Sequence, residues 1–307
     1  MSREGSNRVT QSTGLRRVSG GGRHAESVAL RPMTTADVPA AIALTWDAFG
    51  IPAHSPGLLP TWEARMHMML RTDPDGVFVA LDERRTVIGV SAALARGDLW
   101  VLSLLAVSRD VQSRGTGHAL MRAALDYRSD IDNRLIMSTN DPRAMRLYWQ
   151  AGFALHPAML ASGEIRRERL PAPDPRITEV EIDEIGQLAP ISIAQRGGSH
   201  TEELKMMAGA GARIYRLADR GFVVVSANHE VWLLAALDTE SAQALLGHGL
   251  ARAGRDGPVR VRYVSGANQW AIDILMVAGL DLVADGAVAV AGSPGPLCPY
   301  IPSGPLS

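Results

Sequence analysis

The feature that most constrains the fold is an internal repeat. The stretches IMSTNDPRAMRLYWQAGFAL (136–155) and YVSGANQWAIDILMVAGLDL (263–282) share serine, alanine, glycine and leucine positions that lie 127 residues apart. In each stretch an apolar strand pattern precedes a helical stripe that ends at a glycine, Gly152 or Gly279. The repeat predicts one mixed fold of helices and strands that occurs twice. The alternative is that any strand followed by an alanine-rich helix and a glycine would align in this way.

The length of 307 residues also favours two cores over one. A connection rich in proline and charge, GEIRRERLPAPDPRIT, separates the two repeats. The first residues are polar and rich in glycine and serine, and the last are rich in proline, so we expect disorder at the start and an extended tail on a domain surface at the end. The predicted segments are a tail at 1–27, domains at 28–165 and 176–292, and a tail at 293–307.

Composition excludes several classes of function. The formal net charge is −1, from 31 basic and 32 acidic side chains, so we expect neither nucleic acid nor a membrane surface as a partner. Cys298 is the only cysteine, which excludes an intrachain disulfide and a cysteine-rich zinc site and favours the cytoplasm. His54, His67 and His118 are scattered, so we predict no metal site.

The run VLSLLAVSRDVQSRGTGHALMRAAL (101–125) predicts a buried strand, a turn with two glycines and a helix. Such a turn presents backbone N–H groups and the positive end of the helix dipole, which favours a phosphate. Gly115 and Gly117 would let the phosphate approach the backbone, and Arg114 would add a charged contact. The alternative is an ordinary strand-to-helix turn with a surface arginine. The dinucleotide and Walker glycine motifs are both absent.

A second motif, A-x-x-x-Y-x-x-x-G-F, contains Ala144, Tyr148, Gly152 and Phe153. Together with VSRDVQSRGTG it resembles the GCN5-related N-acetyltransferase (GNAT) family, strongly over 28–160 and weakly, through the repeat, over 176–292. The whole chain resembles the tandem acetyltransferases of high-GC bacteria, in which one copy has degenerated. The resemblance implies an α/β class, with an α+β mixed sheet in two tandem acyl-CoA N-acyltransferase folds, the second degenerate.

The resemblance implies acetyl-CoA as co-substrate. The strand before the turn would bind its pantetheine arm, the turn its pyrophosphate, and the following strand and helix the region of the thioester. The family often has an asparagine at the place where this chain has Asp141, and Asn140 lies one residue earlier. The cofactor-binding residues implied are Leu105, Ala106, Val107, Gln112, Ser113, Arg114, Gly115, Thr116, Gly117, His118, Asn140, Ala144 and Tyr148.

The implied reaction is direct attack of an acceptor amine on the thioester in a ternary complex. Tyr148 occupies the place of the family's general acid, or else it is a core aromatic residue. The strand WVLSLLAV has no carboxylate to act as a base, and the remaining candidates are a water chain, an unprotonated amine, or one of the side chains Asp47, His54, Glu63 and Asp98.

The acceptor would be an amine in a small molecule or peptide, and the chain a monomer or homodimer. Two other functions remain open: a non-catalytic acyl-CoA-binding protein with a regulatory or structural role, and a transferase that uses a longer acyl-CoA or a hydroxyl acceptor. The second repeat has Leu275 at the place of Tyr148, and DTESAQALLGHG in place of the glycine turn. We therefore expect a single acetyl-CoA site, in the first domain.

Overall fold

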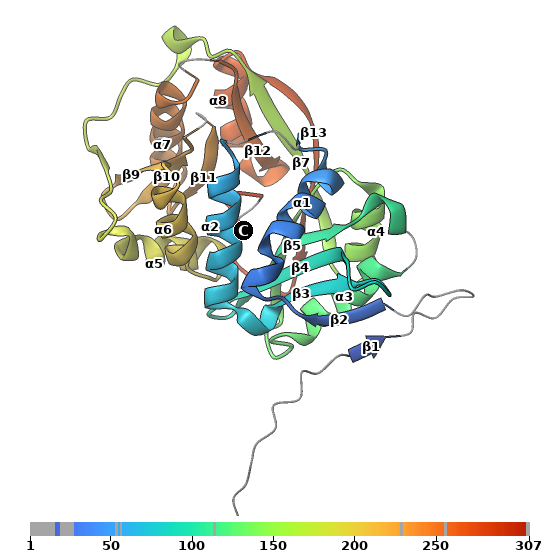
Figure 1. Cartoon of the computed structure of the whole chain (residues 1–307). Coiled ribbons are helices and arrows are strands. Elements are labelled where there is room, and N and C mark those ends of the chain that lie inside the picture. Colours follow the sequence, from blue (N-terminus) through green and yellow to red (C-terminus); the bar gives the residue numbers. More distant parts are fainter. Residues whose placement is uncertain are drawn as a thin grey trace, which may run out of the picture.

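The computed structural model describes residues 16–18, 28–52, 55, 57–112, 115–227, 230–254 and 257–304. The strands of this part of the chain join in one sheet of 14 strands, with helices on both faces (Figure 1). No helix in these ranges is both long enough and apolar enough to span a bilayer.

The helices are α1 (Val38–Phe49), α2 (Leu59–Thr72), α3 (Thr116–Asp126), α4 (Pro142–Gln150), α5 (Ala189–Arg196), α6 (Thr201–Gly209), α7 (Thr239–Arg252) and α8 (Gln269–Val277). The strands of the first half are β1 (Arg16–Val18), β2 (Val28–Pro32), β3 (Val77–Leu81), β4 (Val87–Arg96), β5 (Leu99–Val107), β6 (Asn133–Ser138) and β7 (Ala154–Gly163). Those of the second half are β8 (Ile177–Glu179), β9 (Arg213–Leu217), β10 (Gly221–Val225), β11 (Val231–Ala236), β12 (Val259–Ser265), β13 (Asp281–Ala291) and β14 (Tyr300–Ile301).

In the first half, helices cover both faces of the sheet because successive side chains of a strand point to opposite faces. Leu104 and Ala106 of β5 pack in the core under α1 and α2. Leu105 and Val107 pack on the other face, against the core that includes Leu120 of α3. The continuous apolar run of β5 is thus explained by burial on both faces.

The second half repeats this arrangement, with α5 and α6 on one face of its strands and α7 and α8 on the other. Helices α4 and α8 have the same length and begin and end 127 residues apart. Each is followed by a glycine in the left-handed region, Gly152 with φ 92° and Gly279 with φ 90°. The predicted repeat is therefore confirmed, and the mixed sheet of the predicted fold class with it.

The two halves exchange strands. The order in the centre of the sheet is β6, β13, β7, β12, so the last long strand of each half lies between two strands of the other half. Strand β13 pairs with β6 from Ala287 opposite Ser138 to Ala291 opposite Arg134, and it also pairs with β7. The polar connection after β7 joins the halves along the chain. Strand β13 of 176–292 lies between two strands of 28–165, and strand β7 of 28–165 lies between two strands of 176–292.

The structure describes a short strand within each segment predicted to be a terminal tail. Strand β1 lies within the tail predicted to be disordered and pairs with β2, because backbone pairing needs no apolar pattern. Tyr300 and Ile301 of the proline-rich tail are 1% and 0% exposed, not spread on a surface. They pair with β11 because this short strand uses only the residues between Pro299 and Pro302.

A buried ionic cluster also joins the halves. Arg96 at the end of β4 donates to Asp73 of the first half at 2.7 Å and to Glu203 of α6 at 2.6 Å. All three side chains are at most 9% exposed. Loss of one partner would leave an uncompensated buried charge, so this cluster fixes the orientation of α6 against the first half.

The crossing strand β13 makes a specific steric demand. Gly286 has φ +99°, and a Cβ added to it would lie 2.2 Å from the carbonyl oxygen of Ser138 at the end of β6. We expect Gly286→Ala to lower the free energy of unfolding by about 2 kcal/mol or more, from backbone strain plus the clash. Gly186→Ala is the control, because its Cβ would meet no atom within 4 Å. Equal thermal melting curves for the two variants would contradict this account of the strand exchange.

Candidate active site

The sheet of the first half opens between β5 and β6. Their parallel pairing runs from Leu99 opposite Asn133 to Leu102 opposite Ile136 and stops there. Both strands continue beyond this point, β5 to Val107 and β6 to Ser138. The last part of β5 therefore presents a backbone edge that β6 does not cover. An extended ligand can add to such an edge through main-chain hydrogen bonds.

A bulge lies where the opening begins. Ala92 of β4 is opposite Leu104 and Ala93 is opposite Leu102, so Ser103 is the extra residue of β5. A guanidinium nitrogen of Arg65, on α2, donates to both the carbonyl oxygen and the hydroxyl of Ser103, the latter at 3.1 Å. Since bulges bend a strand and increase its twist, this contact supports the divergence of β5 from β6.

Arg65 is a functional candidate that the sequence analysis missed. It is 5% exposed, no carboxylate pairs with it in the described ranges, and burial lowers its pKa to about 10. Its guanidinium carbon lies 5.0 Å from the centre of the Trp62 ring. The sequence does contain one indication of this role. Arg65 lies on the same helical face as Trp62 and Met69, and a cation on an apolar face needs a structural explanation.

The turn after β5 is tied to both neighbouring elements. The side chain of Gln112 donates to the carbonyl oxygen of Val107 at 3.1 Å and accepts from Arg143 of α4. Arg143 in turn pairs with Asp141, which caps α4, at 2.8 Å. The amide of Gln112, assigned from the sequence to the cofactor, is thus engaged within the protein. Ser113 and Arg114 lie outside the described residues.

The N-terminus of α3 follows this turn and has no acidic residue in its first turn. Gly115 has φ +93°, and a Cβ added to it would meet no atom within 4 Å. Thr116 is 1% exposed, and its hydroxyl oxygen is buried without a hydrogen-bond partner. An open turn, an orphaned hydroxyl and the helix dipole together fit an anionic group such as a phosphate.

Tyr148 of α4 is 6% exposed and packs in the core cluster that contains Trp100 and Leu102 of β5. Burial raises the pKa of its phenol, and the nearby Tyr263 and Asp141 raise it further. Its hydroxyl makes no hydrogen bond to any part of the chain that the structure describes. The phenol therefore stays protonated over a wide pH range.

The other predicted residues lie around this centre. Ala144 is half-buried against the same cluster as Tyr148. His118 is on the surface, with its Nε2 3.2 Å from the side-chain oxygen of Gln150, and Asn140 is exposed. The structure thus brings the β5 edge, the start of α3 and Tyr148 to one opening, with His118 and Asn140 at its margin.

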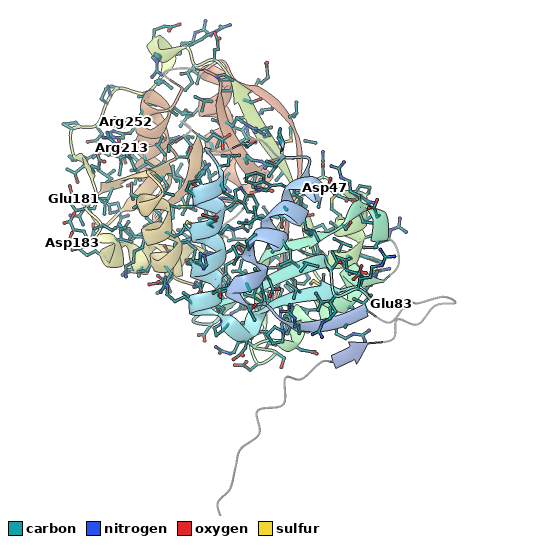
Figure 2. The ribbon with its side chains drawn as sticks, viewed as in Figure 1. Asp47, Glu83, Glu181, Asp183, Arg213 and Arg252 are labelled. Atoms are coloured by element: carbon teal, nitrogen blue, oxygen red, sulfur yellow. The ribbon has the colours of Figure 1, made fainter. Side chains whose placement is uncertain are left out.

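None of the base candidates is a buried carboxylate at the opening. Asp47 is exposed on α1, where Figure 2 labels it, and its carboxylate lies 4.0 Å from Arg109 of the turn after β5. Glu63 is exposed on α2, and Asp98 is exposed in the turn at the opposite end of β5. His54 lies outside the described residues. Among those residues, no group of three or more His, Cys, Asp or Glu side chains could hold a metal ion.

The corresponding opening in the second half, between β11 and β12, is occupied by the C-terminal segment of the chain. Strand β11 has one parallel partner residue in β12, Val231 opposite Val261. Its further edge pairs with β14, Leu234 opposite Ile301 and Ala235 opposite Tyr300. The N–H of Ala236 also donates to the carbonyl oxygen of Pro299 at 3.2 Å. The C-terminal segment thus occupies the edge that corresponds to the uncovered edge of β5.

The helix start in the second half is also closed to an anion. Asp238 caps α7, with its carboxylate accepting from the N–H of Ser241 at 2.7 Å, and pairs with Arg220 at 2.6 Å. A carboxylate at this position satisfies the helix dipole and would repel a phosphate. Leu275, at the place of Tyr148, is fully buried. The features that form the site in the first half are absent or blocked here.

The chain is similar to known proteins both in sequence and in fold. Residues 73–155 match the Acetyltransferase (GNAT) domain family. No curated protein matches the sequence. A proposed acetyltransferase from Pyrococcus horikoshii has a similar structure, with 17% identity, 95% of this chain and 96% of that chain covered, and a TM-score of 0.71.

Two further solved structures resemble the chain over most of its length. A tandem GNAT protein from the clavulanic acid biosynthesis pathway is 15% identical, with 86% of this chain and 98% of that chain covered and a TM-score of 0.54. A GCN5-related N-acetyltransferase from Sphaerobacter thermophilus is 16% identical, with 86% and 95% covered and a TM-score of 0.52. At these identities the likeness concerns the fold.

The pairing of β14 with the edge of β11 can be tested by hydrogen exchange. In a chain that ends at Leu297, we expect the amides of β11 to exchange faster than in the full chain, because the N–H of Ala236 and its neighbours lose their partners. The amides of β4 in the first half serve as the control. Unchanged protection of β11 would contradict the pairing.

Proposed function

We propose that this chain, which contains a GNAT domain within a tandem GNAT fold, is an acetyl-CoA-dependent N-acetyltransferase with one cofactor site, in its first half. The domain match and the fold support acyl transfer in general. The observation that carries the finer proposal is the asymmetry between the halves: the β5 edge is uncovered and leads to an uncapped helix start, whereas the β11 edge is covered by β14.

Acetyl-CoA would lie along the opening. The backbone of Leu105, Ala106 and Val107 would hold the pantetheine arm as an added strand. The residues from 112 to 118, Ser113 and Arg114 among them, would surround the pyrophosphate with backbone N–H groups and the Thr116 hydroxyl. Ala144 and Tyr148 would flank the thioester, and Asn140 would lie at the margin.

In the proposed reaction the lone pair of the acceptor nitrogen attacks the thioester carbon, and the C–S bond breaks with its electrons passing to sulfur. Tyr148, whose phenol is protonated at neutral pH, donates its proton to that sulfur as the C–S bond breaks. The nitrogen loses one proton, and water returns a proton to the phenolate. The products are an N-acetylated acceptor and free CoA, and the holding of both reactants in one opening supplies much of the rate.

No carboxylate on β5 receives the amine proton, so we assign its removal to water at the mouth of the opening. The missing carboxylate also motivates the second candidate function, an acyl-CoA-binding protein without turnover. A longer acyl group or a hydroxyl acceptor would use the same opening, and the assays below separate these cases.

The proposed acceptor is an amine in a small molecule or peptide. The near-neutral formal charge of −1 gives no support for nucleic acid or an anionic membrane as partner. We propose a cytoplasmic protein, monomeric or homodimeric.

Cofactor binding is tested by calorimetry with CoA. We expect one site per chain, weakened at least about a hundredfold by Gly117→Asp, because a carboxylate at the start of α3 would repel the pyrophosphate. Thr239→Ala, at the corresponding start of α7, is the matched control and should leave binding unchanged. Two sites per chain, or none, would refute the assignment of a single site to the first half.

The role of Tyr148 is tested with acetyl-CoA and a panel of amines (ethanolamine, spermidine, glucosamine and lysine), by measuring CoA release and the acetylated product. We expect Tyr148→Phe to lower kcat about a hundredfold, since the proton donor is lost, while CoA affinity stays within twofold. Unchanged kcat would remove Tyr148 from the mechanism. CoA binding without transfer to any amine would favour the non-catalytic function.

A further inference from the structure

Strand β12 of the second half departs from regular geometry at Tyr263. Its register with β7 shifts between Val261 and Val264. Tyr263 has φ +55°, a left-handed conformation that costs a bulky residue about 1–2 kcal/mol. The residue 127 positions earlier, Ile136, lies in β6, whose pairing with β13 has no shift. The irregularity thus belongs to the second copy alone.

Specific contacts hold this strained residue in place. Asp285, 7% exposed, accepts from Arg262 at 2.6 Å and from the N–H of Tyr263 at 3.4 Å. Asp285 and Gly286 form the matching irregularity of β13, where its register with β7 shifts between Ala284 and Ala287. Because this is where β13 crosses into the first half, the strand exchange and the Tyr263 conformation are one feature.

The ring of Tyr263 packs against the two strands that border the opening in the first half. It is 3% exposed and packs in a cluster with Leu99 and Val101 of β5 and with Leu135 and Met137 of β6. Tyr148 packs with Trp100 and Leu102, which alternate with Leu99 and Val101 along β5. The two tyrosines therefore lie on opposite faces of the sheet.

Both phenols lie in buried clusters, and Gly304 of the C-terminal segment lies against the Tyr263 ring. Neither hydroxyl makes a hydrogen bond to another residue of the described ranges, although a buried tyrosine hydroxyl usually has a partner. The two groups are also close enough for Tyr263 to raise the pKa of Tyr148.

We propose that Tyr263 is a positioning residue of the second half, whose hydroxyl hydrogen-bonds the acceptor amine on the face of the opening opposite Tyr148. This inference rests on the proposed function. The amine adds to the thioester carbon from one face of the planar thioester, and because Tyr148 occupies one side of the opening, we assign this approach to the other side, where Tyr263 lies. The degenerate copy then contributes to the reaction without a cofactor site of its own.

The test is Tyr263→Phe in the full chain, assayed with acetyl-CoA and the four amines named above. The variant keeps the ring and the packing and removes only the hydroxyl. We expect the KM for the best amine to rise about tenfold, while the KM for acetyl-CoA and the affinity for CoA stay within twofold. Tyr215→Phe, in a buried core of the second half away from the opening, is the matched control and should leave all these constants unchanged.

The outcomes separate this inference from the proposed function. Absence of CoA binding or of amine acetylation by the unmodified chain refutes the proposed function. If the unmodified chain acetylates an amine and Tyr263→Phe keeps its amine KM within twofold, the function stands and the inference is wrong. A parallel loss of affinity for amine and acetyl-CoA, or a loss that follows a lower melting temperature, also overturns it, because both indicate a structural role.

Discussion

The pairing of β7 with β13 is the interaction on which the rest of the structure depends. These two strands form the seam between the halves, and each also pairs with a strand of the other half, β13 with β6 and β7 with β12. Backbone ladders of this kind satisfy buried N–H and C=O groups that neither half could satisfy alone. The halves are therefore parts of one continuous sheet, and the polar connection joins them along the chain.

The strand exchange also shapes the candidate site. Where β13 lies along β6, Gly286 fits directly against the carbonyl of Ser138, close to the end of the strand that borders the opening. On the other border, Arg65 holds the bulged Ser103. The opening is thus fixed from one side by an arginine of the first half and from the other by a strand of the second half. A first half without the second would lack the strand that pairs with β6, one of the two borders of the opening.

Comparison of the copies shows how small changes leave a strand edge and a helix start open in one copy and close them in the other. Both have two diverging parallel strands connected by a helix, but in the second copy Asp238 caps the start of that helix. Tyr300 and Ile301 replace an external extended chain at the strand edge. In the second copy, residues of the chain itself thus occupy the positions that we propose for the pyrophosphate and the pantetheine arm in the first copy. The second copy also packs Tyr263 against strands of the first half.

The sequence by itself determined the repeated fold and the local parts of the site, because a buried strand, a glycine turn and an amphipathic helix such as 101–125 are specified by residues near one another in the chain. It did not determine the exchange of β7 and β13, because each strand has an apolar pattern that fits either partner. It also missed Arg65 and Tyr263, whose roles depend on contacts with residues distant in sequence. Only the tertiary structure decided which edge stays open and which is covered by β14, since that choice depends on where the chain end can reach.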